Sequence, residues 1–392
     1  MKINKPKLNT NKIFLIILLL FPFYKPDCLT SFYYINYIYT LMSIAVFTFL
    51  FIIYIKKMKI NKFDILIWLF YGILMISTFL NEGSMLKVIS DLSLNIGIVL
   101  LANLFLKENK LEFLKALSIY FYALLILNTI SIVVFPNGIA QTEYLKTPIY
   151  LIGIDNRFAF TYLPGLCIIA IYDYLINKKF TKFTYIYFLA TYITFLYFWS
   201  AGALVAETLF IIFYILVYKF KKKKLVNKYF PTVIILFFTL VIFRLQNLFK
   251  YIIVNVLHKD LTLSSRTLIW DKVIEIISEH KILGIGVQKS NTMIALISAY
   301  HSHSYFLNIM LQAGIIGIII YIIIVFKVFK RLNNNRENFI SQIIAFSLFV
   351  LYIMLLVDTF DITANLFLLL TIGYNIKYLI NDNIIIKKES KE

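Results

Sequence analysis

The sequence predicts an all-α, polytopic membrane protein, and its composition and hydropathy pattern support this fold class. Of its 392 residues, 61% are apolar or aromatic and 15% are charged, and the mean hydropathy is +0.82. A soluble domain has only about 45–50% apolar residues, so the composition excludes a water-soluble fold. The apolar residues form long runs rather than short alternating segments, which is typical of membrane helices and not of a transmembrane β-barrel.

Twelve apolar stretches approach the ~20 residues that a membrane-spanning helix needs. They are residues 12–24, 32–55, 63–80, 88–106, 115–135, 158–176, 183–199, 201–218, 229–243, 303–326, 339–357 and 362–380. The first is short and contains Pro22, and a cleaved signal peptide would look similar. Because the segment Lys25-Pro26-Asp27-Cys28 offers no cleavage site, we expect this span to be retained. The seventh and eighth are separated only by Trp199-Ser200-Ala201-Gly202.

The placement of lysine and arginine predicts the orientation, because cytoplasmic loops are enriched in these residues. With the N-terminus inside, 28 of the 39 basic residues fall on the cytoplasmic side, among them the run Lys221 to Lys224. We therefore expect both termini in the cytoplasm. A net charge of +19 would suggest a nucleic-acid partner in a soluble chain. Here topology accounts for the charge, and no nucleic-acid partner is expected.

The predicted spans divide the chain into three parts. Residues 1–243 hold nine spans, residues 244–302 form one large extracytoplasmic loop between spans 9 and 10, and residues 303–392 hold three spans and a cytoplasmic tail. Apolar residues at helical spacing predict amphipathic helices on the membrane surface near 245–256 and, after a cap signal at Ser264-Ser265, near 269–280. For the first of these, simple capping of the bundle is an equal alternative.

Arginine is rare in this chain, with 5 residues against 34 lysines, and three arginines lie at the predicted outer surface. A guanidinium offers a planar fork that binds phosphate at two points, which an ammonium cannot do. We expect Arg266 and Arg157 to contact an anionic ligand. Arg244, at a helix end, fits either an anion contact or an interface anchor.

All four histidines, His258, His280, His301 and His303, lie in the outward loop or at its end. His303 begins an apolar helix at the outer surface, where a neutral imidazole can act as a general base; a structural role at the helix start is the alternative. His301 and His303 are two residues apart, which places their rings on opposite sides of a strand or badly on a helix. The sequence therefore predicts no metal site.

Six acidic residues lie within or beside the spans, and such carboxylates are candidates for a functional role. They are Asp64, Asp91, Asp173, Glu207, Asp358 and Asp361. Most lie near span ends and are expected to reach the interface. Only Glu207 is clearly inside a span, where it either pairs with an arginine or lines a cavity.

Three motifs carry a resemblance to a known family. The segment Ser265-Arg266-Thr267-Leu268-Ile269-Trp270 is followed by Leu283-Gly284-Ile285-Gly286, and then by His303-Ser304, nine residues, Gly314, two residues and Gly317. Together they resemble the signature of the O-antigen ligase/polymerase (Wzy/WaaL) superfamily. The spacing fits His303 and fails for His301, for which Gln312 occupies the first glycine position. The chain departs from the family pattern at Ser200-Ala201, where a Ser-Arg pair is common.

The resemblance implies a GT-C-like fold in a bacterial cytoplasmic (inner) membrane, with a reactive arginine and histidine in the large outward loop. The catalytic residues would be Arg266 and His303. The candidates for substrate binding are Arg157, Arg244, Trp270, His301 and Glu207. Gly314 and Gly317 would form a small-residue face that packs closely against a neighbouring helix.

The leading hypothesis is a polymerase that joins undecaprenyl-diphosphate-linked oligosaccharide repeat units into a surface polysaccharide (O-antigen, capsule or exopolysaccharide). It would be a metal-independent, inverting glycosyltransferase without a cofactor, with membrane lipid and a chain-length regulator as further partners. One alternative keeps the donor but is an O-antigen ligase or protein O-oligosaccharyltransferase. A flippase for the same lipid is a more distant alternative, because transport needs symmetric halves that the sequence lacks.

Overall fold

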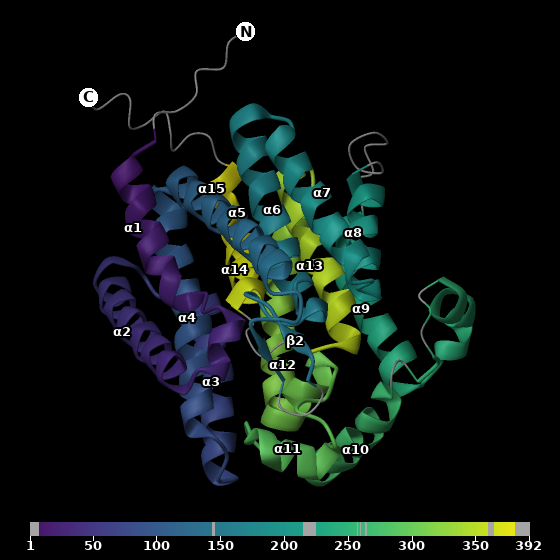
Figure 1. The fold of residues 1–392 in the computed structure, drawn as a ribbon. Helices are drawn as coiled ribbons and strands as arrows, with labels where there is room; N and C mark the ends of the chain where they lie inside the picture. The colour runs from purple at the N-terminus through teal and green to yellow at the C-terminus, as the bar shows by residue number, and fades with distance from the viewer. Residues whose placement is uncertain are drawn as a thin grey trace.

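The computed structural model is an almost entirely helical bundle (Figure 1). It describes residues 8–142, 146–214, 225–256, 258, 260–262, 265–359 and 364–380. The strands in this part of the chain, β1 (Ala140–Gln141) and β2 (Pro148–Ile149), form a small antiparallel hairpin in which Ala140 lies opposite Ile149. The predicted helical fold class is confirmed.

The α-helices vary from one short turn to long rods, and several are followed by 3-10 or π-helical turns. The α-helices are α1 (Thr10–Leu20), α2 (Tyr33–Lys57), α3 (Lys62–Leu80), α4 (Met85–Glu108), α5 (Lys110–Val134), α6 (Ala159–Asn177), α7 (Lys182–Tyr197), α8 (Ala201–Tyr214), α9 (Val226–Leu236), α10 (Arg266–Glu279), α11 (Ser290–Ile297), α12 (Tyr305–Asn334), α13 (Phe339–Val357), α14 (Ala364–Tyr374) and α15 (Ile376–Ile380). The 3-10 turns are Phe21–Phe23, Asp27–Ser31, Asp155–Arg157 and Gln246–Phe249, and the π-helical segments are Phe237–Ile242 and Tyr251–Val256.

All twelve apolar stretches are mostly helical over their described residues. Seven helical segments are long and apolar enough to cross a membrane: Tyr33–Lys57, Lys62–Leu80, Met85–Glu108, Lys110–Val134, Asp155–Asn177, Tyr305–Asn334 and Phe339–Val357. Shorter apolar helices occupy Thr10–Phe23, Ala201–Phe213, Val226–Ile242 and Ala364–Tyr374. These helices indicate a multi-pass membrane protein, while the number of twelve spans stays a prediction.

The predicted break near Ser200 is confirmed. α7 ends at Tyr197 and α8 begins at Ala201, and Trp199 between them has a left-handed backbone with φ of +48°. The backbone N–H of Ser200 donates to the carbonyl of Phe195 at 3.0 Å, which closes the turn. Glu207 therefore lies on a separate helix from the residues before Trp199.

The two ends of the bundle carry different parts of the chain. Figure 1 shows the start of α1 and the short α15 at one end of the bundle, and α10 and α11 at the other. This arrangement is the one expected if both termini are cytoplasmic and the large loop is outside, and that orientation stays a prediction. The run Lys221 to Lys224 and the tail from residue 381 lie outside the described residues.

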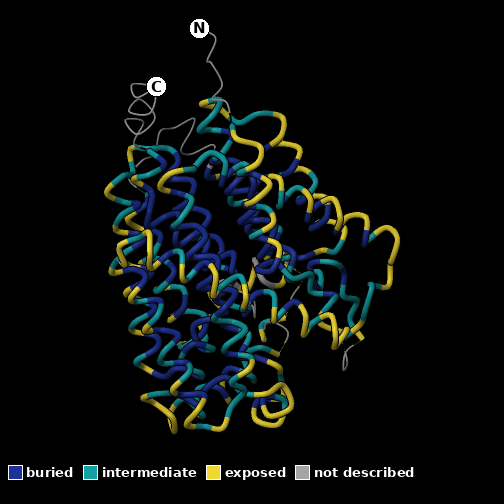
Figure 2. The backbone as a smooth tube through the Cα atoms, turned by 90° about the vertical axis from the view of Figure 1, so that its left-hand side faces the viewer, coloured by how far each residue is buried: buried dark blue, intermediate teal, exposed yellow. Residues whose placement is uncertain are grey.

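The core lies where α12 and α13 meet α3, α4, α6 and α14, and Figure 2 shows buried backbone through this interior. Every residue of α14 is buried. α12 packs against α3 on one side and α14 on another. The first turn of α12 is thus held by the centre of the bundle.

A buried polar network near Asp64 ties α2, α3 and α4 to the turn between α14 and α15. Its carboxylate accepts hydrogen bonds from Tyr54 and, at 2.8 Å, from the Asn103 amide, which in turn accepts from Asn375 at 2.6 Å. Asp64 is fully buried, and its side chain also caps the start of α3 together with Asn61. The expectation that most of the acids near span ends reach the interface stays a prediction.

The backbone of α12 is broken at Gly314, which has φ of +61° and ψ of −161°. The turn segment 281–286 fills this break. Ile285 N donates to Leu311 O at 2.8 Å, Gly286 N to Gln312 O at 3.1 Å, and Ile315 N to Lys281 O at 2.9 Å. These bonds satisfy backbone groups that a kinked helix leaves without partners.

The predicted role of the two glycines needs correction. A Cβ on Gly314 would lie 2.2 Å from the carbonyl oxygen of Ile282, so its close neighbour is the backbone of a loop and not another helix. A Cβ on Gly317 would meet Ala313 of its own helix at 2.2 Å. The apolar run around Gly314 hides this kink in the sequence, because glycine is also compatible with a continuous membrane helix.

The same loop docks on the turn between α3 and α4. Val287 N donates to Thr78 Oγ1 at 2.9 Å, and Ser84 N donates to Val287 O at 2.7 Å. Gly286, with φ of +70°, lies so close that a Cβ would be 2.4 Å from Thr78 Cα. The Leu-Gly-Ile-Gly motif therefore joins α10 to both α3 and α12.

The outward loop contains one of the two predicted amphipathic helices. α10 covers most of 269–280, but residues 245–256 form a 3-10 turn and a π-helical segment instead of an α-helix. Ser265 makes no capping hydrogen bond from its side chain, because its φ of +65° differs from the extended backbone of an N-cap, and Ser264 lies outside the described residues. α11 was not predicted.

We expect Gly314→Ala to destabilise the protein strongly, because alanine at a left-handed φ is strained and its Cβ collides with Ile282. Strain and overpacking together would cost about 2–4 kcal/mol. The measurement is the apparent Tm of the protein purified in detergent. The control is Gly72→Ala, since no atom lies within 4 Å of a Cβ there. Equal Tm values for the two variants would contradict the docking of 281–286 on the kink.

Candidate active site

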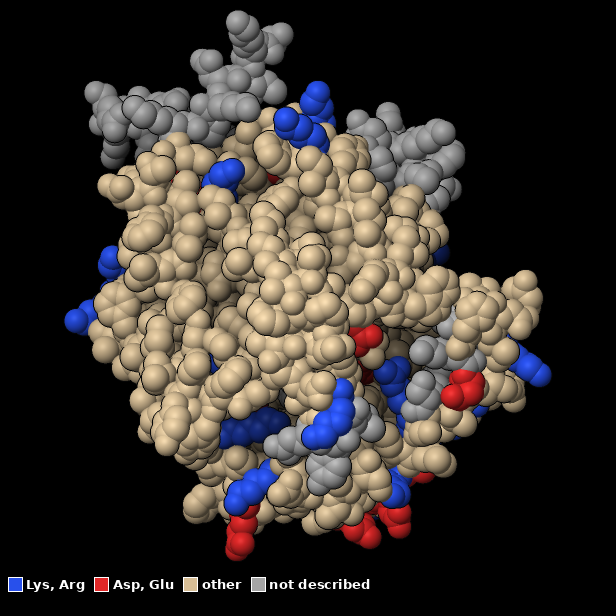
Figure 3. Space-filling model, in the orientation of Figure 1, with Lys and Arg blue, Asp and Glu red and all other residues tan. Residues whose placement is uncertain are grey.

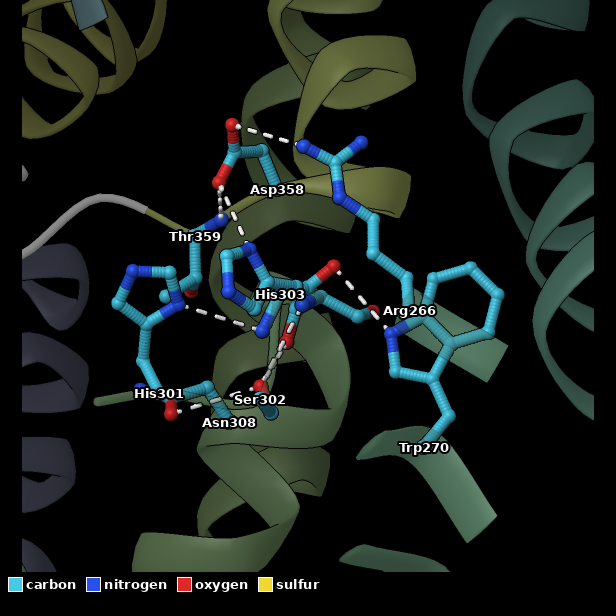
Figure 4. Close-up of polar contacts among 9 residues, drawn as sticks. Arg266, Trp270, His301, Ser302, His303, Asn308, Asp358 and Thr359 are labelled. Carbon is cyan, nitrogen blue, oxygen red and sulfur yellow. Dashed lines mark hydrogen bonds and ion pairs between the residues drawn. The ribbon is translucent and has the colours of Figure 1, made fainter. Parts of the chain in front are cut away.

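The site begins with the four residues before α12, His301 to Ser304. Ser302 and Ser304 are fully buried, and Ser302 Oγ donates to Ser304 O at 2.7 Å. This local bond holds a tight bend in which His303 has φ of +50°. A left-handed backbone is costly for a residue with a side chain, so the surrounding contacts must fix it. The bend directs the His303 ring away from the helix axis and toward Asp358 (Figure 4).

Asp358, the residue directly after α13, lies between the two predicted catalytic side chains. One carboxylate oxygen is 3.6 Å from Arg266 Nη2, and the other is 3.8 Å from His303 Nδ1 (Figure 4). The latter oxygen also accepts the backbone N–H of Thr359 at 2.8 Å. Arg266 comes from the start of α10, so three segments distant in sequence meet at one carboxylate.

Asp358 lies directly after α13, at the end of a predicted span, and its depth relative to the membrane stays a prediction. Its side chain is only 20% exposed, and its carboxylate oxygens lie 3.6 Å from Arg266 Nη2 and 3.8 Å from His303 Nδ1. Sequence reasoning marked it as an acid near a span end but gave no reason to pair it with Arg266 or His303. Asp361 lies outside the described residues.

The charges around Asp358 keep it ionised. Burial by itself would raise its pKa, but the His303 contact, the Arg266 charge and the two imidazoles outweigh this effect and hold the pKa below the usual range of an aspartate. A carboxylate beside an imidazole can fix the orientation of that ring. Asp358 therefore holds the His303 ring in place at the site.

His301 supports His303 from the other side. Its Nδ1 accepts the backbone N–H of His303 at 3.3 Å, and the two ring centres are 4.2 Å apart. The side chain of His301 is buried. It therefore holds the bend, in addition to any contact with substrate.

Trp270 fastens α10 to the same bend. Its indole N–H donates to His303 O at 3.3 Å, and its side chain is fully buried. The Arg244 guanidinium lies over its ring, 4.9 Å from the ring centre, and also bonds to Asp271 Oδ1 at 2.5 Å and Thr267 O at 3.2 Å. Trp270 and Arg244 thus position Arg266 and His303 relative to each other.

Two further predicted residues make other contacts. Arg157 Nη1 lies 3.7 Å from Asp27 Oδ2, which pairs the turn before α6 with the segment between α1 and α2. Glu207 is fully buried, and its Oε1 accepts from Thr191 Oγ1 of α7 at 2.5 Å. In the described part of the chain Glu207 forms no ion pair with an arginine, so that alternative for its role is wrong.

The bend at His303 also removes the spacing argument that His301 and His303 cannot share a metal ion. Ligand atoms of His301, His303 and Asp358 all lie within 4.8 Å of one another, because the left-handed His303 brings both rings to one side. These three groups could hold a divalent cation. The Arg266 guanidinium competes for the same carboxylate, and its positive charge disfavours a cation at this position.

The cluster lies on an exposed face of the molecule. Arg266, His303 and Asp358 are between 20% and 30% exposed, so a substrate can reach them. Figure 3 shows acidic and basic side chains meeting in a recess of one face, beside a broad uncharged surface. A fixed guanidinium next to an imidazole–carboxylate pair can neutralise a leaving phosphate and remove a proton.

Comparison with known proteins gives a family match over part of the chain. No curated protein and no solved structure matches the chain. Residues 185–322 match the family model described as O-antigen ligase. The matched range runs from α7 into α12 and includes Arg266 and His303, while Asp358 lies beyond it. This match over part of the chain supports its resemblance to the O-antigen ligase/polymerase superfamily.

Proposed function

We propose that this protein is a polymerase that joins undecaprenyl-diphosphate-linked repeat units into a surface polysaccharide at the outer face of a bacterial cytoplasmic membrane. The family match suggests a ligase or polymerase of lipid-linked glycans. The observation that carries the proposal is the single carboxylate of Asp358, which contacts both Arg266 and His303.

Arg266 is proposed to bind the diphosphate of the donor. Its guanidinium has five N–H donors, and the contact with Asp358 uses one nitrogen, which leaves other donors for phosphate oxygens. The diphosphate develops charge as the bond to the sugar breaks, and a fixed cation stabilises that charge most in the transition state. Arg157 is proposed to add a second positive charge to the donor site.

His303 is proposed to act as the general base. Its ring removes the proton from an acceptor hydroxyl, the freed oxygen attacks the anomeric carbon, and the bond from that carbon to the diphosphate breaks. The electron pair leaves with the lipid diphosphate, and the proton remains on the imidazole, which Asp358 stabilises. A single displacement inverts the anomeric carbon, and no metal or cofactor takes part.

The family model's own description favours a ligase as the second candidate. A ligase would use the same donor and the same residues but would transfer the glycan to a lipid A core or to a protein hydroxyl. Longer chains made from the lipid-linked unit alone would support the polymerase, and transfer only to a different acceptor would support the ligase. A chain-length regulator is proposed as a partner of the polymerase.

Replacing His303 by alanine should abolish polymer formation, whereas His301→Ala should leave long chains, because His301 contacts the backbone of His303 and is not proposed to take the proton. The measurement is the length of surface polysaccharide on a gel, in a deletion strain that carries each variant at equal membrane levels. His280→Ala, at an exposed residue at the end of α10, is the control. Long chains in the His303→Ala strain would exclude His303 as the base.

Arg266→Lys should lose most activity despite keeping its charge, because an ammonium cannot bind a diphosphate at two points. Loss of this contact would cost about 2–4 kcal/mol in the transition state, or roughly 30- to 1000-fold in rate. The measurement is turnover of lipid-linked donor by purified protein. Arg331→Lys is a matched control at the far end of α12, where Arg331 bonds to Tyr374 O at 2.6 Å. Equal rates for Arg266→Lys and the parent would exclude two-point binding of the diphosphate and indicate that Arg266 only anchors its segment at the membrane interface.

A further inference from the structure

A cavity lies between α3, α4 and α12, next to the bend that carries His303. α4 lines it with Lys87, Asp91 and Asn95, which are spaced by four residues and so lie along one face of the helix. α12 faces them with Asn308 and Gln312, also four residues apart. Two rows of polar side chains therefore face each other across this space.

Aromatic rings complete the lining. Phe70 and Tyr71 come from α3, and Tyr305 comes from the first turn of α12. Phe70 and Tyr305 each contact the buried Tyr321, with ring centres 5.6 and 5.4 Å apart, so these rings are held by the core. The cavity thus combines rigid apolar rings with amides, one carboxylate and one ammonium.

One polar atom in this lining has no partner. Asn95 is only 2% exposed, and its Oδ1 forms no hydrogen bond within the described structure. A buried carbonyl oxygen without a donor is costly, and a native protein keeps one mainly where a ligand or ordered water supplies the missing bond. Asn95 therefore indicates that something with a donor binds in the cavity.

The cavity is joined to the candidate active site through Asn308. Asn308 lines the cavity, and its Oδ1 lies 3.5 Å from Ser302 Oγ in the bend beside His303 (Figure 4). A ligand in the cavity would therefore lie next to the bend that carries the base.

We propose that this cavity binds the sugar of the acceptor glycan whose hydroxyl attacks the donor. The inference rests on the proposed function. Sugar hydroxyls donate and accept hydrogen bonds at the same time, which suits amides and a carboxylate, while the C–H face of the ring packs on aromatic side chains. Lys87 and Asp91 bring opposite charges, so the lining fits an uncharged sugar better than a second diphosphate.

The test measures binding without turnover. The probe is the repeat-unit oligosaccharide released from the polysaccharide of the strain that carries the gene, free of lipid and diphosphate. Saturation-transfer NMR would measure its Kd for the full protein in nanodiscs. We expect Asn95→Leu and Gln312→Leu each to weaken binding by about tenfold, since each removes a hydrogen bond in a buried site.

Asn365→Leu is the matched control, because Asn365 is also a buried asparagine with an unpartnered Oδ1 but lines a different cavity, beside Tyr24 and Lys25. It should keep the parent Kd. Unchanged binding in both cavity variants, no binding to the parent, or equal loss in the Asn365→Leu control would each overturn the proposal. Turnover by His303→Ala would instead overturn the proposed catalytic role and leave the binding result in place.

Discussion

The rest of the site depends on the docking of residues 281–286 against the kink at Gly314. If α12 were a continuous helix, its backbone N–H and C=O groups would bond to one another, and none here would be left to bond a loop. The kink exposes the carbonyls of Leu311 and Gln312, and Ile285 and Gly286 donate to them. Val287, directly after these residues, donates to Thr78 in the last turn of α3. Because α10 leads directly into this loop, its position relative to α12 is set, and Arg266 can reach the carboxylate that His303 faces.

The carboxylate of Asp358 then sets the electrostatics. A buried acid without partners would be neutral, and a guanidinium without a counter-ion would repel the imidazolium that forms during proton transfer. Asp358 faces both groups. Its negative charge therefore lies between Arg266 and a protonated His303 and offsets the repulsion between them. Arg244 and Trp270 place α10 so that this arrangement persists. Asn308 extends the polar contacts from the bend to the cavity beside α4.

Much of this organisation could be predicted from the sequence, for identifiable reasons. A long apolar run predicts a membrane helix without knowledge of what packs against it. Arginine and histidine are rare in this chain, and this rarity indicated Arg266 and His303 as site residues. Asp358 could not be paired with them, because it lies after another span and no local pattern marks it. The kink at Gly314 and the left-handed His303 were equally hidden, since both depend on contacts made only in the folded chain. The same bend is why the spacing argument against a metal at His301 and His303 does not hold geometrically.

The central claim is that a fixed guanidinium, imidazole and carboxylate perform the transfer, although His301, His303 and Asp358 lie close enough to hold a cation. The most direct measurement is turnover of an undecaprenyl-diphosphate-linked donor by the purified protein in excess EDTA, followed by addition of magnesium, manganese or zinc. A metal would be needed if no fixed cation met the leaving phosphate, and here Arg266 is proposed to do so. The account predicts the same rate with and without EDTA. Loss of turnover on chelation, with recovery when one of these metals is added, would contradict it.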